Sequence, residues 1–143
     1  MVTASSSETN WGGNYTYRAR ELHRPTSLEQ VQQLIASAES VHVLGSRHSF
    51  NDIGDATELI SLAALPPDVV LDRGAGTVSF SAGLTYGGLA EVLNAEDLAL
   101  HNLASLPHIS VAGAVATATH GSGKPQRQPG DGCGRPGDGH VQR

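Results

Sequence analysis

The feature that most constrains the fold of this chain is an amphipathic helix followed by a short strand and a glycine turn. Pro25 precedes the helix, and both Thr26 and Ser27 have a Glu or Gln three residues later, the spacing of a capping box. One apolar stripe runs along the predicted helix: Leu28, Val31, Leu34, Ile35 and Ala38. A strand is predicted over 41–44, and it ends at Gly45. This order is typical of an α/β unit that presents a loop at the end of a strand.

Further short strands are predicted on both sides of this unit. Residues 14–19 alternate polar with aromatic or apolar positions, which favours a strand. Further along the chain, turn-forming Pro and Gly residues separate three more predicted strands: 58–65, 69–72 and 77–82. The last two would form a hairpin. Thr85 would cap a second helix, whose apolar face (Leu89, Val92 and Leu93) would pack on that hairpin.

Composition divides the chain of 143 residues unevenly. Residues 124–143 contain five Gly, three Pro and only two apolar residues, Cys133 and Val141, and so cannot build a core. We therefore expect a flexible N-terminus over 1–13, one domain over 14–123 and a disordered tail over 124–143.

Charge and cysteine content restrict the partners. Up to Gly123 there are five Arg, no Lys and twelve acidic residues, which gives about −7 and disfavours nucleic acid and anionic membranes. The lone Cys133 allows no intrachain disulfide, and no run of 18 apolar residues occurs. We expect a monomeric, cytoplasmic protein with a small-molecule partner and no nucleic-acid or membrane partner.

The first candidate site is the loop that follows the strand over 41–44. It comprises Val43, Leu44, Gly45, Ser46, Arg47, His48 and Ser49. Exposed amides and hydroxyls of such a Gly-Ser loop could hold phosphate, with Arg47 adding positive charge. Strand-Gly-Ser turns are common, however, and from spacing alone a histidine such as His48 is more often an ordinary loop residue.

The second candidate site is a stretch over 103–123 in which side chains become small and hydroxyls become frequent. An extended ligand could lie along it, or the small residues could form a helix packed against a sheet, and the pattern leaves both readings open. His108 and His120 fit a structural role as well as a ligand role. The seven His include no tight pair, and neither a P-loop nor a G-x-G-x-x-G turn occurs, so we expect no metal and no dinucleotide Rossmann site.

Three stretches, residues 10–14, residues 43–51, and residues 104–113 with the closing 119–123, together resemble the flavoprotein superfamily of the vanillyl-alcohol-oxidase type. Within it the chain is similar to bacterial alditol/xylitol oxidases, which are related to gulonolactone and arabinonolactone oxidases. The resemblance implies an α+β (α/β) fold: the N-terminal part of a PCMH-type FAD-binding domain, with a small β-α-β subdomain and the start of a second α+β subdomain. It also implies FAD as the cofactor.

The resemblance assigns roles to individual residues. It implies that Gly45 to Ser49 surround the FAD pyrophosphate and that His48 bonds covalently to the flavin 8α carbon. Ser105 would lie at the flavin face and touch substrate. The remaining implied cofactor contacts are Ser110, Gly113, Ala114, Val115, Ala116 and His120. Many relatives have Gly where Arg47 stands, which makes a role for the Arg47 side chain doubtful.

The implied chemistry is hydride transfer from a C–OH carbon of a polyol to flavin, followed by reoxidation of the flavin by O2 to give H2O2. The resemblance places the base and the hydroxyl-binding groups in a later substrate domain, so no catalytic base is predicted in this chain. Two alternatives remain: an inactive FAD-binding remnant, and a flavin dehydrogenase with another electron acceptor.

The tail also departs from the pattern of the family. Back-translation of residues 126–133 in the frame one base later admits Asn-Gly-Asn-Leu-Ala-Thr-Ala-Val, which resembles the turn and strand of relatives. We therefore hypothesise a frameshift near codon 124. Because strands of the second sheet would then be missing, we expect weak FAD binding and low stability.

Overall fold

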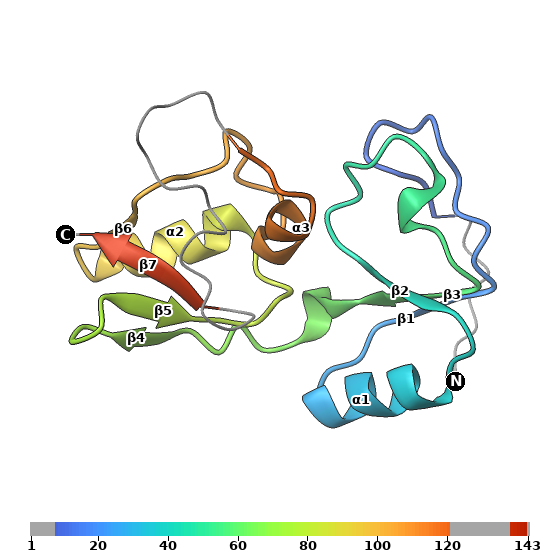
Figure 1. The fold of residues 1–143 in the computed structure, drawn as a ribbon, viewed down its shortest axis with the longest axis horizontal. Coiled ribbons are helices and arrows are strands. Elements are labelled where there is room, and N and C mark those ends of the chain that lie inside the picture. The colour runs from blue at the N-terminus through green and yellow to red at the C-terminus, as the bar shows by residue number, and fades with distance from the viewer. Residues whose placement is uncertain (1–7, 121–137, 143) are drawn as a thin grey trace. The chain divides into compact units, whose positions relative to one another are not determined.

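The computed structural model describes residues 8–120 and, for the backbone, 138–142 (Figure 1). The chain divides into two compact units, Met1–Pro66 and Pro67–Arg143. Both mix helices with sheets, which confirms the predicted α+β class with a β-α-β part followed by a second α+β part. No described helix is long and apolar enough to cross a membrane.

The first unit is a parallel sheet with one crossover helix. Strand β3 (Glu58–Ser61) lies between β1 (Glu21–His23) and β2 (Val41–Leu44). Helix α1 (Leu28–Ser37) connects β1 to β2, as parallel pairing requires, and lies against one face of the sheet (Figure 1). Ser27 caps α1 by accepting the Gln30 amide at 3.4 Å, as the capping-box spacing predicts.

Alternation along β3 sends neighbouring side chains to opposite faces of the sheet. Leu59 is 1% exposed and packs with Leu44 and Tyr17, on the side that carries the N-terminal segment. Ile60 is also buried, and its side chain therefore lies on the other face. Only Val31 of α1 is buried, although the apolar stripe predicted five inward positions.

The strand predicted over 14–19 is wrong. Tyr17 is buried in the core of the unit, with Tyr15 and Ala19 packed beside it, so the alternation does reflect burial. The backbone, however, folds back on residues 8–10 through a single bridge between Thr9 and Thr16. The sheet strand β1 begins only at Glu21.

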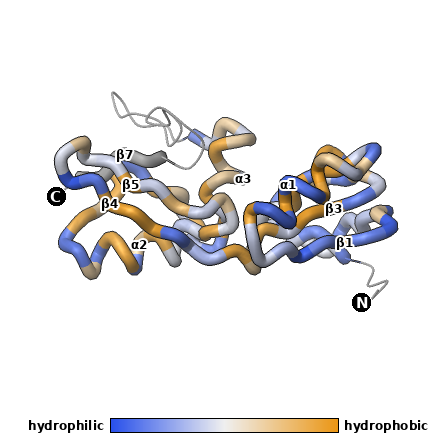
Figure 2. The backbone as a smooth tube through the Cα atoms, turned by 90° about the horizontal axis from the view of Figure 1, so that it is seen from below, coloured by the Kyte–Doolittle hydropathy of each residue, from blue (hydrophilic) through white to orange (hydrophobic). Residues whose placement is uncertain are grey.

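The second unit is a helix packed on an antiparallel sheet. The hairpin of β4 (Val70–Asp72) and β5 (Thr77–Ser79) is confirmed, although both strands are shorter than predicted. Helix α2 (Tyr86–Ala95) is capped by Thr85 and buries Leu89 and Leu93 against Val78 of β5. Val92 is 38% exposed and lies outside that face. Figure 2 shows hydrophobic positions of α2 interrupted by hydrophilic ones, as this arrangement requires.

Other elements of the chain were not anticipated. The predicted strand over 58–65 ends at Ser61 and continues as a 3-10 turn, η2 (Leu62–Ala64). Strand β6 (Ala99–Leu100) follows α2, and β7 (Asp138–Gln142) lies between β5 and β6.

Both predicted disordered ends need correction. Because β7 belongs to the sheet, the predicted disorder is wrong for residues 138–142, while 124–137 and 143 lie outside the described residues. The prediction of a flexible N-terminus is likewise wrong for residues 8–13. Asn10 is 2% exposed, and its side chain donates hydrogen bonds to Asn14 and to the Ser49 carbonyl. Residues 1–7 lie outside the described residues.

Candidate flavin-binding site

The predicted site residues divide between the two units. Val43 and Leu44 end β2, and Gly45 to Ser49 form the loop that leads to the 3-10 turn η1 (Asp52–Gly54). In the second unit, Ser105 lies in the loop after β6. The other residues lie in or next to helix α3 (Val111–Ala116): Ser110, Gly113, Ala114, Val115, Ala116 and His120.

The loop over 45–49 depends on one residue in a left-handed conformation. Arg47 has a φ of 63°, a region that favours glycine, which is the residue the resemblance leads one to expect there. The Arg47 guanidinium binds the Glu8 carboxylate, which also binds Arg24 at 2.9 Å. The positive charge of Arg47 is therefore paired with Glu8, and the structure does not support Arg47 as the free cation of a phosphate site.

Residues 10–14, to which the resemblance assigns no contact of their own, hold this loop in place. We call residues 10–14 the N-terminal clamp. Its buried Asn10 side chain donates to the Ser49 carbonyl at 3.1 Å and accepts the Tyr15 amide at 3.0 Å. The Asn14 side chain donates to the Phe50 carbonyl at 3.1 Å, and the Trp11 amide donates to the Arg47 carbonyl at 2.8 Å. Three carbonyls in and just after the loop, those of Arg47, Ser49 and Phe50, are thus bound by one short segment of chain.

Glycine is favoured at positions 12 and 13 of the clamp for two different geometric reasons. A Cβ on Gly12 would lie 2.7 Å from Cε1 of Phe50, so a larger residue could not approach the loop as closely. Gly13 has a φ of 69° and closes the turn with a hydrogen bond from its amide to the Asn10 carbonyl. Two consecutive glycines followed by Asn14, with Asn10 three residues before Gly13, are the sequence signal that could have identified this turn.

The imidazole ring of His48 has one contact on its face and one at its edge. Its ring stacks on the Trp11 indole, with ring centroids 4.9 Å apart and an interplanar angle of 19°. Its Nδ1 lies 3.0 Å from the Ser46 carbonyl oxygen. Because a carbonyl oxygen can only accept, this contact assigns the Nδ1 hydrogen in the neutral ring.

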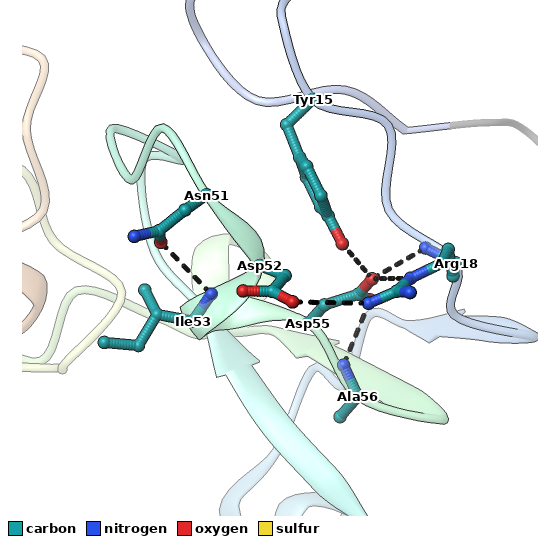
Figure 3. A network of polar contacts seen from close by, with 7 residues as sticks. All are labelled: Tyr15, Arg18, Asn51, Asp52, Ile53, Asp55 and Ala56. Carbon is teal, nitrogen blue, oxygen red and sulfur yellow. Dashed lines mark hydrogen bonds and ion pairs between the residues drawn. The ribbon is translucent and has the colours of Figure 1, made fainter.

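A second polar network supports the loop from the other end (Figure 3). The Asp55 carboxylate accepts the Tyr15 hydroxyl at 2.7 Å and the Arg18 amide at 3.0 Å. Burial alone would raise the pKa of Asp55, but the hydrogen bonds from Tyr15, Arg18 and Ala56 outweigh it, and the pKa lies below its ordinary value. Asp55 thus ties the segment after the clamp to the segment after η1.

In the second unit the predicted small-residue stretch is a short helix. Val111 and Ala114 of α3 are buried in the core with Leu89, which supports the reading of a helix packed in the fold. A cofactor contact at Gly113 to Ala116 stays a prediction, because only Val111 and Ala114 of this helix are buried. An added Cβ on Gly113 would lie 2.6 Å from the Ser110 Oγ, so a larger residue there would require the Ser110 side chain to shift.

The start of α3 is attached to the start of α2. The Tyr86 amide donates to the Ile109 carbonyl at 3.0 Å, and the Gly87 amide donates to the Pro107 carbonyl at 2.7 Å. A Cβ on Gly87 would lie 3.1 Å from that same oxygen. Gly87 is a poor helix former and weakens the first turn of α2, but its lack of a side chain allows this close approach.

Ser105, Ala116, His108 and His120 are exposed, whereas Ser110 is 7% exposed. Of the other predicted contacts in this unit, Ala114 is buried, and Gly113 and Val115 are half-buried. Within residues 8–120 and 138–142 no group of three His, Cys, Asp or Glu side chains is arranged to hold a metal ion.

Comparison with known proteins identifies the domain. Residues 20–133 match the family described as the FAD binding domain, which is most of the chain. The chain belongs to this FAD-binding domain family. In this family context the loop over 45–49 fits a phosphate-bearing cofactor, because the Arg47 and Ser49 amides donate to no group among the described residues.

Relatives of this FAD-binding domain are oxidoreductases. The chain is 49% identical over 123 residues to an alditol oxidase of Streptomyces sp. (strain IKD472 / FERM P-14339), which covers 83% of this chain and 30% of that enzyme. It is 33% identical over 120 residues to an L-gulono-1,4-lactone dehydrogenase of Mycobacterium tuberculosis, covering 80% of the chain and 28% of the relative. The chain therefore spans less than a third of the length of either enzyme.

A solved structure shares the fold. Cholesterol oxidase from B. sterolicum superposes with a TM-score of 0.67 at 19% identity, over 79% of this chain and 23% of that one. At this identity the similarity concerns the fold alone. The predicted flavoprotein fold and the predicted relation to alditol and lactone oxidoreductases are thus confirmed.

Proposed function

We propose that this domain binds FAD in an oxidase that converts a polyol of the alditol type, such as xylitol, to the corresponding carbonyl compound. The observation that carries the proposal is the loop over 45–49, which offers two backbone amides and a stacked histidine in a chain 49% identical to an alditol oxidase. The bound flavin would take the hydride of the carbinol carbon and pass two electrons to O2. Polyol and O2 would give carbonyl product and H2O2.

We further propose that His48 bonds covalently to the flavin 8α carbon. A bond would form between an imidazole nitrogen and the 8α carbon, while the methyl group and the imidazole each lose one hydrogen to O2, which becomes H2O2. Neutral imidazole is a competent nucleophile near neutral pH. Linkage through Nδ1 would require loss of its contact to the Ser46 carbonyl, whereas linkage through Nε2 would keep it.

The experiment is to incubate the purified chain with FAD in air, denature it in acid and measure the flavin fluorescence that stays with the protein. We expect a fluorescent protein band for the natural chain and none for His48→Ala. His42→Ala is the matched control, because His42 is an exposed histidine on β2. A band that persists in His48→Ala would refute the covalent role of His48.

Turnover is tested separately by H2O2 release with xylitol or another alditol. A dehydrogenase is the second candidate, because one relative is an L-gulono-1,4-lactone dehydrogenase. A dehydrogenase would reduce a dye with polyol when oxygen is excluded, and would release no H2O2 with polyol in air. Flavin binding without either reaction would favour an FAD-binding module that does not act on polyol by itself. A monomeric cytoplasmic protein remains a prediction.

A further inference from the structure

We propose that Trp11 is a positioning residue for His48, and that its indole holds the imidazole in the orientation from which the histidine bonds to the flavin. This inference rests on the proposed function, because it assumes the covalent bond at His48. Trp11 would not touch the reacting carbon. It would act through the ring on which it stacks, at a centroid distance of 4.9 Å.

Burial argues against a core role for the Trp11 side chain. Trp11 is 60% exposed, although tryptophan is the largest apolar side chain and is rarely left at the surface without a local reason. It does not belong to the cluster of Tyr17, Leu44 and Leu59 that forms the core of this unit. Its ring stacks on the imidazole of His48.

The backbone of Trp11 is fixed independently of its side chain. Its amide binds the Arg47 carbonyl, Asn10 on one side is buried, and the Gly12-Gly13 turn follows on the other. The indole is thus carried by a rigid segment that is itself bound to the loop of His48. A substitution at Trp11 should remove the stack and leave the clamp in place.

Two contacts then fix the His48 ring. The Ser46 carbonyl limits rotation in the plane of the ring, and the Trp11 indole limits tilt out of that plane. Holding a nucleophile in one orientation speeds its reaction by removing unproductive rotamers. An aromatic pair of this geometry accounts for about three- to tenfold in that population.

The test compares Trp11→Phe with Trp11→Leu in the full chain. Leu keeps apolar bulk without a ring, whereas Phe keeps a ring that can stack. We expect the rate of covalent flavin attachment to fall about three- to tenfold in Trp11→Leu and to stay near that of the natural chain in Trp11→Phe. Attachment at the natural rate in Trp11→Leu, or equal losses in both variants, would overturn the inference.

A second readout needs no flavin. In the chain without FAD, the indole shields the ring protons of His48, so their NMR signals should move downfield in Trp11→Leu and much less in Trp11→Phe. Circular dichroism should show both variants folded, and unfolding of Trp11→Leu would contradict the independence of the backbone argued above. Unmoved His48 signals in Trp11→Leu would overturn the inference by themselves.

The outcomes separate the inference from the proposed function. If the natural chain attaches flavin, His48→Ala does not, and Trp11→Leu is unaffected, then the positioning role is wrong and the covalent site stands. If the natural chain attaches no flavin, the covalent site is wrong and the positioning role is wrong with it.

Discussion

Replacing Asn10 with alanine tests whether the N-terminal clamp holds the loop of His48. The Asn10 side chain is 2% exposed and makes three hydrogen bonds: to the Asn14 Oδ1 at 2.7 Å, to the Ser49 carbonyl at 3.1 Å, and from the Tyr15 amide at 3.0 Å. At about 1 kcal/mol for each bond, the free energy of unfolding should fall by about 3 kcal/mol. That is a large part of the roughly 5–15 kcal/mol typical of a domain.

The assay uses the single tryptophan of the chain. Because Trp11 is the residue next to Asn10, urea unfolding followed by its fluorescence reports the first unit directly. Asn14→Ala is the matched control, since Asn14 is exposed and water can replace its lost hydrogen bonds. We expect Asn14→Ala to cost about 1 kcal/mol or less. A cost for Asn10→Ala no larger than that of Asn14→Ala would refute the prediction that the buried Asn10 is the main anchor of the clamp.

Three further predictions concern backbone strain, pH and core packing. Arg47→Gly should be about 1 kcal/mol more stable than Arg47→Ala in urea unfolding, because both lose the pair with Glu8 but only glycine relieves the left-handed backbone; equal stabilities would contradict this. The lowered pKa of Asp55 means that the unfolded chain binds its proton first as the pH falls. The stability due to Asp55 is therefore complete above the ordinary pKa of an Asp carboxyl and is lost as pH falls through the lowered pKa, and urea midpoints of Asp55→Asn should lack this loss. Leu89 is fully buried on α2, so Leu89→Ala should lower the free energy of unfolding by about 2–5 kcal/mol, measured by far-UV circular dichroism. Val92→Ala should lower it by about 1 kcal/mol or less, and similar losses for the two variants would contradict the described packing.

The helices were predictable because their signals are local. The cap of α1 joins Ser27 to an amide three residues away, and the cap of α2 joins Thr85 to Gly88 in the same way. The hairpin of β4 and β5 is equally local, with Gly76 in a left-handed conformation between the strands. Such contacts lie within one window of sequence, where spacing and residue type are sufficient to predict them.

The strands were less predictable because backbone pairing does not depend strongly on side chains. Residues 14–19 alternate as a strand would, but their backbone partners are residues 8–10 rather than the sheet. Residues 138–142 have a composition typical of disorder, yet their backbone pairs with β5 and β6. An edge of a sheet offers hydrogen-bonding groups to any extended segment that can reach it.

The same division applies to the site. The sequence by itself determined that a strand ends in a Gly-Ser loop with His48, and that small residues gather near Ser110, because residue type and order carry this information. Only the tertiary structure decided that Asn10 and Trp11 hold that loop, since Asn10 binds Ser49 across 39 positions of the chain. It also decided that Arg47 pairs with Glu8 instead of remaining free. Contacts between distant segments depend on how the whole unit packs, and spacing in the sequence does not encode them.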